Sequence, residues 1–179
     1  MITSFEPIID KNCKILVLGT MPSVKSLEKQ QYYGNKQNQF WKIIYSLFNK
    51  DVEENYENRK IFLLNHHIAI WDVLKSCDRE GSSDSKIINP VPNDFETFFN
   101  QYPNIKAVFF NGSKAEELFR KLVIGKMNLK EGLLFYRLPS TSPANAILFK
   151  DKLDQWKVIL SYLVYNSNKV DSIKIKFAL

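Results

Sequence analysis

The chain has 179 residues, of which 45% are hydrophobic, and its 25 lysines and arginines outweigh 19 acids to give a formal net charge of +6. This length and composition suit one domain with a full hydrophobic core and exclude an intrinsically disordered chain. A moderate basic excess is compatible with a polyanionic partner, but it is equally explained by solubility alone.

Several other classes of protein are excluded by what the sequence lacks. Cys13 and Cys77 form no CxxC pair, so neither a disulfide framework nor a zinc site is indicated. His66 and His67 are adjacent and point apart on a strand or helix, so they cannot hold one metal ion. The start, "MITSFEPIIDKN", does not resemble a signal peptide, and no apolar run approaches the ~18 residues of a membrane span. We therefore expect a cytoplasmic protein with no metal and no membrane partner.

The first half of the chain alternates between strand and helix patterns. Residues 14–18, in "KILVLGTMPS", predict a buried strand that ends at a glycine and a proline. The segment "NQFWKIIYSLFNK" has helical spacing, and Asn38 is a suitable N-cap for it. A second short strand is expected to end at Asn65, in "FLLN", before a helix or extended run that ends near Cys77.

The second half contains the clearest unit. Asp94 is expected to cap a short helix. Residues 105–110 predict a buried strand, residues 111–113 a tight turn, and residues 115–123 an amphipathic helix. A fourth strand, in "LLFYRLPSTSPANA", stops at Pro139, and "KDKLDQWKVILSYLVY" predicts a closing helix.

Strands that alternate with helices predict an α/β fold with a parallel sheet covered on both faces. We expect one domain over residues 1–165, followed by a C-terminal tail at 166–179. Ligands of such sheets bind at the carboxyl ends of the strands. The loops "GTMPS", "NGS" and "LPSTSPAN" follow strands, and "QYYGNKQNQFW" follows the first of them, so all four are expected to meet in one cleft.

The predicted cleft has the composition of a site for a nucleobase. The sequence contains no GxxxxGK[ST], GxGxxG or GxSxG motif. The loops supply aromatic rings, amides and hydroxyls with few charges, which suit the faces and edges of a base and the oxygens of a phosphate. Ordinary packing is the alternative for Tyr32 and Tyr33. Asp72 is either a carboxylate of the pocket or a structural acid, such as a helix cap.

These motifs resemble a known family. "LGTMPSVKSL…QYYGNKQNQFW" together with "LPSTSPAN" is similar to the uracil-DNA glycosylase superfamily. The blocks "IAIWDVLKSCDREGSSD" and "FFNGSKA" are typical of its hypoxanthine (deoxyinosine) DNA glycosylase branch, and mismatch-specific uracil/thymine glycosylases come next. The resemblance runs from about Ile15 to Trp156.

The resemblance implies a three-layer αβα sandwich around a short central parallel sheet. It implies a monofunctional DNA glycosylase of base excision repair, which flips a deaminated base (hypoxanthine, and also uracil) out of DNA and hydrolyses its N-glycosidic bond. No cofactor and no metal are implied, the partner is DNA that contains a damaged base, and a monomer is expected. A uracil/thymine mismatch-specific glycosylase and a non-catalytic binder of damaged DNA on the same fold are the alternatives.

The resemblance also assigns roles to residues. Asn38 is the catalytic residue, which holds a water near the sugar carbon, although its amide also suits the helix cap described above. Tyr33 stacks on the extruded base. Met21 stands where mismatch-specific relatives carry a water-orienting asparagine, and more active uracil enzymes carry an aspartate nearby; the hypoxanthine branch is similar in lacking it. The residues expected to bind the base are Gly19, Thr20, Met21, Tyr33, Asn65 and Asn111. Those expected to contact DNA, by holding phosphates and filling the gap left by the base, are Pro139, Ser140, Thr141, Ser142 and Asn145.

Overall fold

The structure is a computed structural model that describes residues 1–164. The predicted tail, residues 166–179, lies outside the described residues. None of the described helices is long and apolar enough to cross a membrane.

Four parallel strands form the centre of the molecule. They pair in the order β3-β2-β6-β7. Their bounds are Ile15–Gly19 for β2, Ile68–Asp72 for β3, Ala107–Asn111 for β6 and Leu134–Leu138 for β7. The register places Gly19 beside Asp72 and Asn111 beside Leu138, so all four strands end at one edge of the sheet.

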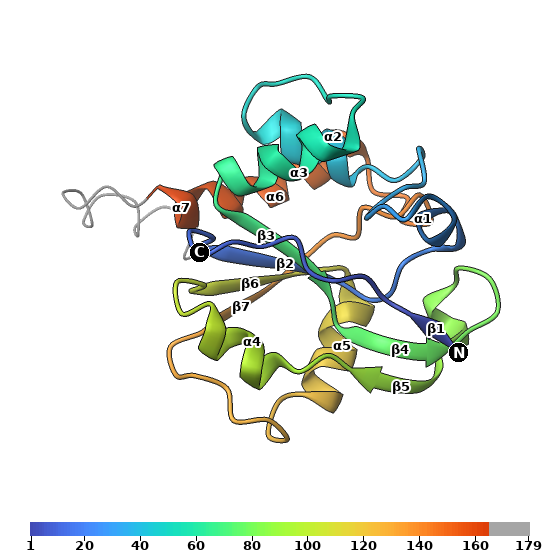
Figure 1. The fold of residues 1–179 in the computed structure, drawn as a ribbon. Helices are drawn as coiled ribbons and strands as arrows, with labels where there is room; N and C mark the ends of the chain where they lie inside the picture. Colours follow the sequence, from blue (N-terminus) through green and yellow to red (C-terminus); the bar gives the residue numbers. More distant parts are fainter. Residues whose placement is uncertain (165–179) are drawn as a thin grey trace.

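Helices cover both faces of this sheet (Figure 1). One face carries α2 (Phe40–Leu47), α3 (Tyr56–Asn65) and α6 (Phe149–Trp156), and the other carries α4 (Phe95–Gln101) and α5 (Ser113–Leu122). The short helices are α1 (Val24–Lys29), η1 (Asp84–Lys86), η2 (Lys157–Ile159) and α7 (Leu160–Leu163). The predicted three-layer αβα architecture is confirmed.

The core forms where the helices press aromatic side chains onto the strands. Every residue of β2 is buried, as expected for a strand that is covered on both faces. Phe40 and Trp156 are fully buried and make an edge-to-face contact at 6.0 Å between α2 and α6. Asp94 caps α4 as predicted, since its side chain accepts a hydrogen bond from the backbone N–H of Thr97 at 3.0 Å.

A second, antiparallel sheet was not predicted. It consists of β1 (Ile2–Thr3), β4 (Leu74–Asp78) and β5 (Ile88–Pro92), in the order β1-β4-β5. β3 continues through Val73 directly into β4, so this sheet extends from the edge of the main one at which the strands end (Figure 1).

The expected strand ending at Asn65 is wrong. Residues Tyr56–Asn65 form the helix α3, which Asn55 caps by accepting a hydrogen bond from the backbone N–H of Asn58 at 3.1 Å. The strand begins only at Ile68 and ends at Asp72. Asp72 therefore takes the position at the end of the second strand that the sequence analysis gave to Asn65.

Candidate active site

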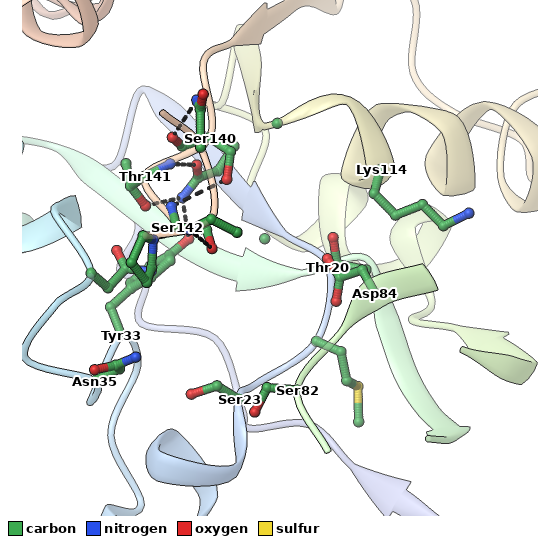
Figure 2. A pocket seen from close by; sticks show the side chains of 18 of the residues that line it. Thr20, Ser23, Tyr33, Asn35, Ser82, Asp84, Lys114, Ser140, Thr141 and Ser142 are labelled. Atoms are coloured by element: carbon green, nitrogen blue, oxygen red, sulfur yellow. Dashed lines mark hydrogen bonds between the residues drawn. The ribbon is translucent and has the colours of Figure 1, made fainter. Parts of the chain in front are cut away.

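A cavity of about 1230 Å³ opens at the edge where the parallel strands end. Its walls come from the loops after β2, β6 and β7, from the end of β3 and from the polar loop that precedes β5. Figure 2 shows hydroxyl and amide side chains from these separate segments around one space. The predicted meeting of "GTMPS", "NGS" and "LPSTSPAN" is thus what the structure shows.

At the floor of the cavity a glycine makes room for a carboxyl group. A Cβ atom on Gly19 would lie 2.5 Å from Asp72 Oδ1 and 3.2 Å from the hydroxyl oxygen of Tyr33. Both distances are shorter than ordinary contacts, so only glycine allows the two polar groups to approach this strand end. Asp72, Tyr33 and the backbone of Gly19 therefore converge at one point.

Tyr33 is held firmly in place. One face of its ring stacks on Phe40 with the ring centroids 3.8 Å apart and the planes 17° from parallel. Its hydroxyl oxygen accepts a hydrogen bond from Asn111 Nδ2 at 3.2 Å. Its backbone adopts a φ of 53°, a left-handed conformation that is costly for a tyrosine. Such a conformation persists only where the surrounding structure holds the residue in place, and it is frequent at ligand-binding sites. The ring of Tyr33 lines the cavity.

Asn111 connects Tyr33 to the loop that follows β7. Its Nδ2 also donates to Thr141 Oγ1 at 2.9 Å, and its Oδ1 accepts from the backbone N–H of Thr141 at 2.8 Å. Both amide hydrogens are thereby used. Asn111 therefore positions Tyr33 and Thr141, and since its Oδ1 can accept a second hydrogen bond, its expected contact with a base edge stays a prediction.

The loop 139–145 is tightly organised. Gly112, at a φ of 99°, brings the turn after β6 so close that an added Cβ would lie 2.9 Å from the Cβ of Ser140. Within the loop, Asn145 Nδ2 donates to the Ser140 carbonyl at 2.9 Å and the Ser142 N–H donates to Ser140 Oγ at 3.2 Å. Thr141 is completely buried. These contacts within the loop and with the turn after β6 fix the positions of Ser140 and Ser142.

Asn38 lines the cavity, and its side chain also serves the helix that follows. Its Oδ1 accepts a hydrogen bond from the backbone N–H of Phe40, the first residue of α2, at 2.9 Å. The N-cap position itself is Gln39, one residue later than predicted. The oxygen can accept a second hydrogen bond and Nδ2 stays available, so capping and an interaction with water are compatible.

Two acids, Asp72 and Asp84, line the cavity. Burial raises the pKa of Asp72 to about 7, against the opposing effect of the hydrogen bond that its Oδ2 accepts from Ser4 Oγ at 2.7 Å. Asp84, from the polar loop, lies beside Thr20 (Figure 2), and burial raises its pKa as well. Asp72 does not cap a helix, because it ends the strand β3, and it lines the cavity.

Arg79 holds the polar loop that precedes β5 in place beside the cavity. Its side chain is fully buried, and it donates to the carbonyl oxygens of Gly81 and Pro22 and pairs with Asp84 at 3.4 Å. Ser82 Oγ accepts from the backbone N–H of Val24 at 2.9 Å, at the start of α1. The resemblance includes part of this loop, "REGSSD", but its place at the cavity was not predicted; the signals for it are that resemblance and an excess of hydroxyls.

The predicted site residues divide clearly. Asn65 ends α3 and does not line the cavity. The others do line it: Gly19, Thr20, Met21, Tyr33, Asn38, Asn111, Pro139, Ser140, Thr141, Ser142 and Asn145. Within residues 1–164, no three His, Cys, Asp or Glu side chains gather closely enough to hold a metal ion.

Comparison with known proteins identifies the family. The sequence model of the uracil DNA glycosylase superfamily matches residues 6–164. The chain belongs to this superfamily. Two curated relatives are both named hypoxanthine DNA glycosylase. The one from Methanosarcina acetivorans is 36% identical over 159 residues, which are 88% of this chain and 97% of the relative. The one from Methanosarcina barkeri is 37% identical over 153 residues, 85% of this chain and 93% of the relative.

A solved structure agrees with the superfamily assignment. The solution NMR structure of a Methanosarcina acetivorans protein, proposed to be a uracil DNA glycosylase, superposes with a TM-score of 0.77 at 36% identity. The match covers 90% of this chain and 97% of that one. The uracil DNA glycosylase fold thus extends over most of the chain.

Proposed function

We propose that this member of the uracil DNA glycosylase superfamily is a monofunctional DNA glycosylase that removes hypoxanthine, and also uracil, from DNA by hydrolysis. The names of the two curated relatives support the substrate class, deaminated bases, and the activity belongs to base excision repair. The observation that carries the proposal is the convergence of Gly19, Tyr33, Asn38 and the serine loop on one cavity at the sheet edge.

The size of the cavity supports a nucleotide as its occupant. At about 1230 Å³ it exceeds the roughly 300–1,000 Å³ of typical small-molecule sites, which leaves room for a base, its sugar and flanking phosphates. A base inside duplex DNA cannot reach such a cavity, so it must be rotated out of the stack. In our proposal the free face of Tyr33 receives the rotated base, and the phosphates beside it lie against Ser140 and Ser142.

Hydrolysis needs a water that is aimed at the sugar carbon and a leaving base whose charge is stabilised. Asn38 is proposed to orient the water, since its amide can accept and donate hydrogen bonds but cannot act as a base. Met21, whose thioether cannot activate water, lines the cavity. Positioning and leaving-group stabilisation must therefore supply most of the rate acceleration.

An exposed apolar side chain next to the serine loop fits the gap in the duplex. Leu148 is 72% exposed, and its neighbour Ile147 is 42% exposed and lines the cavity mouth. Proteins that distort DNA often insert such side chains between base steps. We propose that Leu148, which was not predicted from the sequence, is the side chain that inserts into the duplex, and that Asn145 stabilises the loop.

One observation favours the alternative of a non-catalytic binder. Asn38 Oδ1 already accepts the N–H of Phe40, so a purely structural use of this side chain explains its presence. A binder would bind hypoxanthine-containing duplexes without turnover.

The proposed partner is DNA with a damaged base, and we propose that the protein acts as a monomer. A repair enzyme must be in the compartment that holds the DNA, here proposed to be the cytoplasm. The two free cysteines, Cys13 and Cys77, are both buried, which fits a reducing compartment.

The test is an excision assay on duplexes that carry hypoxanthine, uracil, xanthine or only normal bases, followed by alkaline cleavage of abasic sites. We expect strand cleavage at hypoxanthine, slower cleavage at uracil and none at normal bases. Binding of the hypoxanthine duplex without any cleavage of the damaged substrates would establish the binder instead.

A further inference from the structure

We propose that Ser26 is a positioning residue of the reaction: its buried hydroxyl holds the peptide group after Tyr33, so that the free face of the Tyr33 ring stays turned into the cavity. The inference rests on the proposed function, in which that face receives the rotated base. It gives a role in the reaction to a serine of α1 that was not predicted from the sequence.

The backbone of Tyr33 needs support to keep its conformation. Its φ of 53° lies in the left-handed region, where the Cβ of a tyrosine comes close to the following carbonyl oxygen. Such a residue returns to a negative φ unless its surroundings prevent the rotation. Because peptide groups are planar, the orientations of the two that flank Tyr33 set its φ and ψ. The contacts of these two peptide groups therefore decide where the ring lies.

Both flanking peptide groups are held by buried side chains. The one before Tyr33 is held at its carbonyl, since Trp41 Nε1 donates to the Tyr32 oxygen at 3.0 Å. The one after it is held at its N–H, since Gly34 donates to Ser26 Oγ at 3.1 Å. Trp41 is 4% exposed and Ser26 is 3% exposed. Rotation of either peptide group would leave a buried polar group without its partner, which is costly.

The close approach of Gly34 to α1 makes the bond to Ser26 possible. A Cβ atom on Gly34 would lie 3.2 Å from the Cα of Ser26 and 3.3 Å from the carbonyl oxygens of Gln31 and Lys25. These distances are shorter than ordinary contacts, so a side chain at this position would push the peptide group away from Ser26.

Ser26 also connects Tyr33 to the loop "GTMPS" that follows β2. Its Oγ and Ser23 Oγ are hydrogen-bonded to each other at 3.1 Å, and its backbone N–H donates to Ser23 Oγ at 3.2 Å. Ser23 is the N-cap of α1 and lines the cavity (Figure 2). One hydroxyl can serve Gly34 and Ser23 together, because it has one hydrogen and two lone pairs. Two walls of the cavity are thereby fixed relative to each other.

A ring that is fixed in advance serves the reaction in two ways. Phe40 covers one face of Tyr33 with the ring centroids 3.8 Å apart, so only the other face can receive a base. Fixing that face before binding removes the cost of ordering it during binding. It also keeps the stacked base in one orientation while water attacks the sugar. Without the bond from Gly34 to Ser26, the strained backbone relaxes and the ring leaves this position.

The experiment is single-turnover excision of hypoxanthine by the full chain at saturating enzyme concentration, in a double-mutant cycle. Ser26→Ala should slow excision about tenfold, because the Gly34 N–H loses its acceptor. Tyr33→Leu should slow it about 10- to 100-fold, because the base loses its stacking partner. In the Tyr33→Leu background no ring remains to be positioned, so Ser26→Ala should slow excision further by less than about twofold. A role in folding alone would not depend on the ring in this way.

Two further variants complete the cycle. Ser26→Cys fills the same space, but its sulfur is a weak acceptor, so it should show the same loss and the same dependence on Tyr33. It replaces Ser26→Ala if that variant does not fold. Ser76→Ala is the matched control, because Ser76 is a buried serine of β4 that does not line the cavity, and its rate should equal that of the wild type. All variants should bind an undamaged duplex as the wild type does, and thermal unfolding midpoints report their folding.

Each outcome decides between the possibilities. The inference is overturned, and the proposed function stands, if folded Ser26→Ala excises at the wild-type rate, or if it loses as much in the Tyr33→Leu background as alone. It is also overturned if neither Ser26 variant folds, since the hydroxyl then serves the fold as a whole. A wild type that excises none of the deaminated bases overturns the proposed function, and the inference with it.

Discussion

Asn38 is the residue at which structural and catalytic roles compete. Its oxygen supports the first turn of α2 through Phe40, and its amide lines the cavity. Asn38→Ala is expected to reduce the single-turnover rate on hypoxanthine by about 100-fold or more, because the water loses its orientation. The same change should lower the free energy of unfolding by about 1 kcal/mol, because the N–H of Phe40 loses its acceptor.

The matched control is Asn38→Asp, which keeps the oxygen that accepts from Phe40 and should preserve stability. Binding to a hypoxanthine duplex, measured by fluorescence anisotropy, should change little in either variant. If Asn38→Ala loses stability but turns over at the wild-type rate, the catalytic role is wrong and the capping role is sufficient.

Asp72 should make folding stability depend on pH in a way that is independent of activity. Its pKa rises from the usual 3.8 to about 7 on folding, so the folded state binds this proton more tightly than the unfolded chain. The contribution to stability is intact below about pH 4 and is lost as the pH rises through about 7. Between about pH 5 and about pH 8, the wild type should lose about 2–3 kcal/mol relative to Asp72→Asn.

Urea unfolding of both proteins at the two pH values measures this difference. Other carboxyl groups titrate equally in the two proteins, so the comparison isolates Asp72. An equal pH dependence of the wild type and Asp72→Asn would mean that the carboxyl group is ionised in the folded protein throughout.

At the scale of elements, the buried lysine of α6 joins three parts of the site. Lys152 is 1% exposed, and its Nζ donates to Gln39 Oε1 at 2.9 Å and to the Asn145 carbonyl at 3.0 Å. Burial lowers its pKa. It links α6 to the start of α2 and to the serine loop, which Trp156 also holds through the Pro139 carbonyl at 3.0 Å.

Lys152→Met should therefore loosen the serine loop without removing any group that contacts DNA. We expect faster hydrogen exchange of the backbone amides in residues 139–145 and at least about tenfold weaker binding of a hypoxanthine duplex. Lys157→Met, which removes an exposed partner of Asp154 on the following turn, is the control and should change neither. Unaltered exchange in the Lys152 variant would contradict the linking role.

The elements that the sequence predicted are those with strong local signals. The unit from β6 to α5 combines a buried apolar run, an Asn-Gly turn and an amphipathic helix, and it formed as expected. The strand predicted at "FLLN" is wrong because an apolar run this short is compatible with both a strand and a helix. Asn55, ten residues before the end of this run, caps the helix α3 and favours the helix.

The antiparallel sheet could not be predicted from the sequence, for a different reason. β1 has two residues, and β5 contains Pro90 and Pro92 and is largely exposed, as is typical only of an edge strand.

The candidate site was predictable where motifs follow strands. For Asp72 the sequence left a carboxylate of the pocket and a structural acid as alternatives, and it did not indicate Asp84. The environment of both is created by Ser4, Gly19 and Arg79 from distant parts of the sequence.

At the scale of the whole molecule, the net charge of +6 should appear in the salt dependence of DNA binding. Phosphate contacts release counterions, so the logarithm of affinity should fall linearly with the logarithm of salt concentration. Lys25 is exposed at the cavity wall, and Lys25→Ala should reduce the magnitude of that slope by about 1. Lys50→Ala, outside the cavity, should leave the slope unchanged. Identical slopes for the wild type and both variants would mean that Lys25 does not contact the DNA.

The central claim is that the cavity between Gly19, Tyr33 and the serine loop holds a base turned out of the duplex. It is tested most directly by a crystal structure of the protein with a duplex that carries 2′-fluoro-deoxyinosine, whose glycosidic bond resists hydrolysis. We predict that hypoxanthine lies in the cavity against Tyr33. A complex in which the base stays stacked in the duplex, or is bound elsewhere on the protein, would contradict the account.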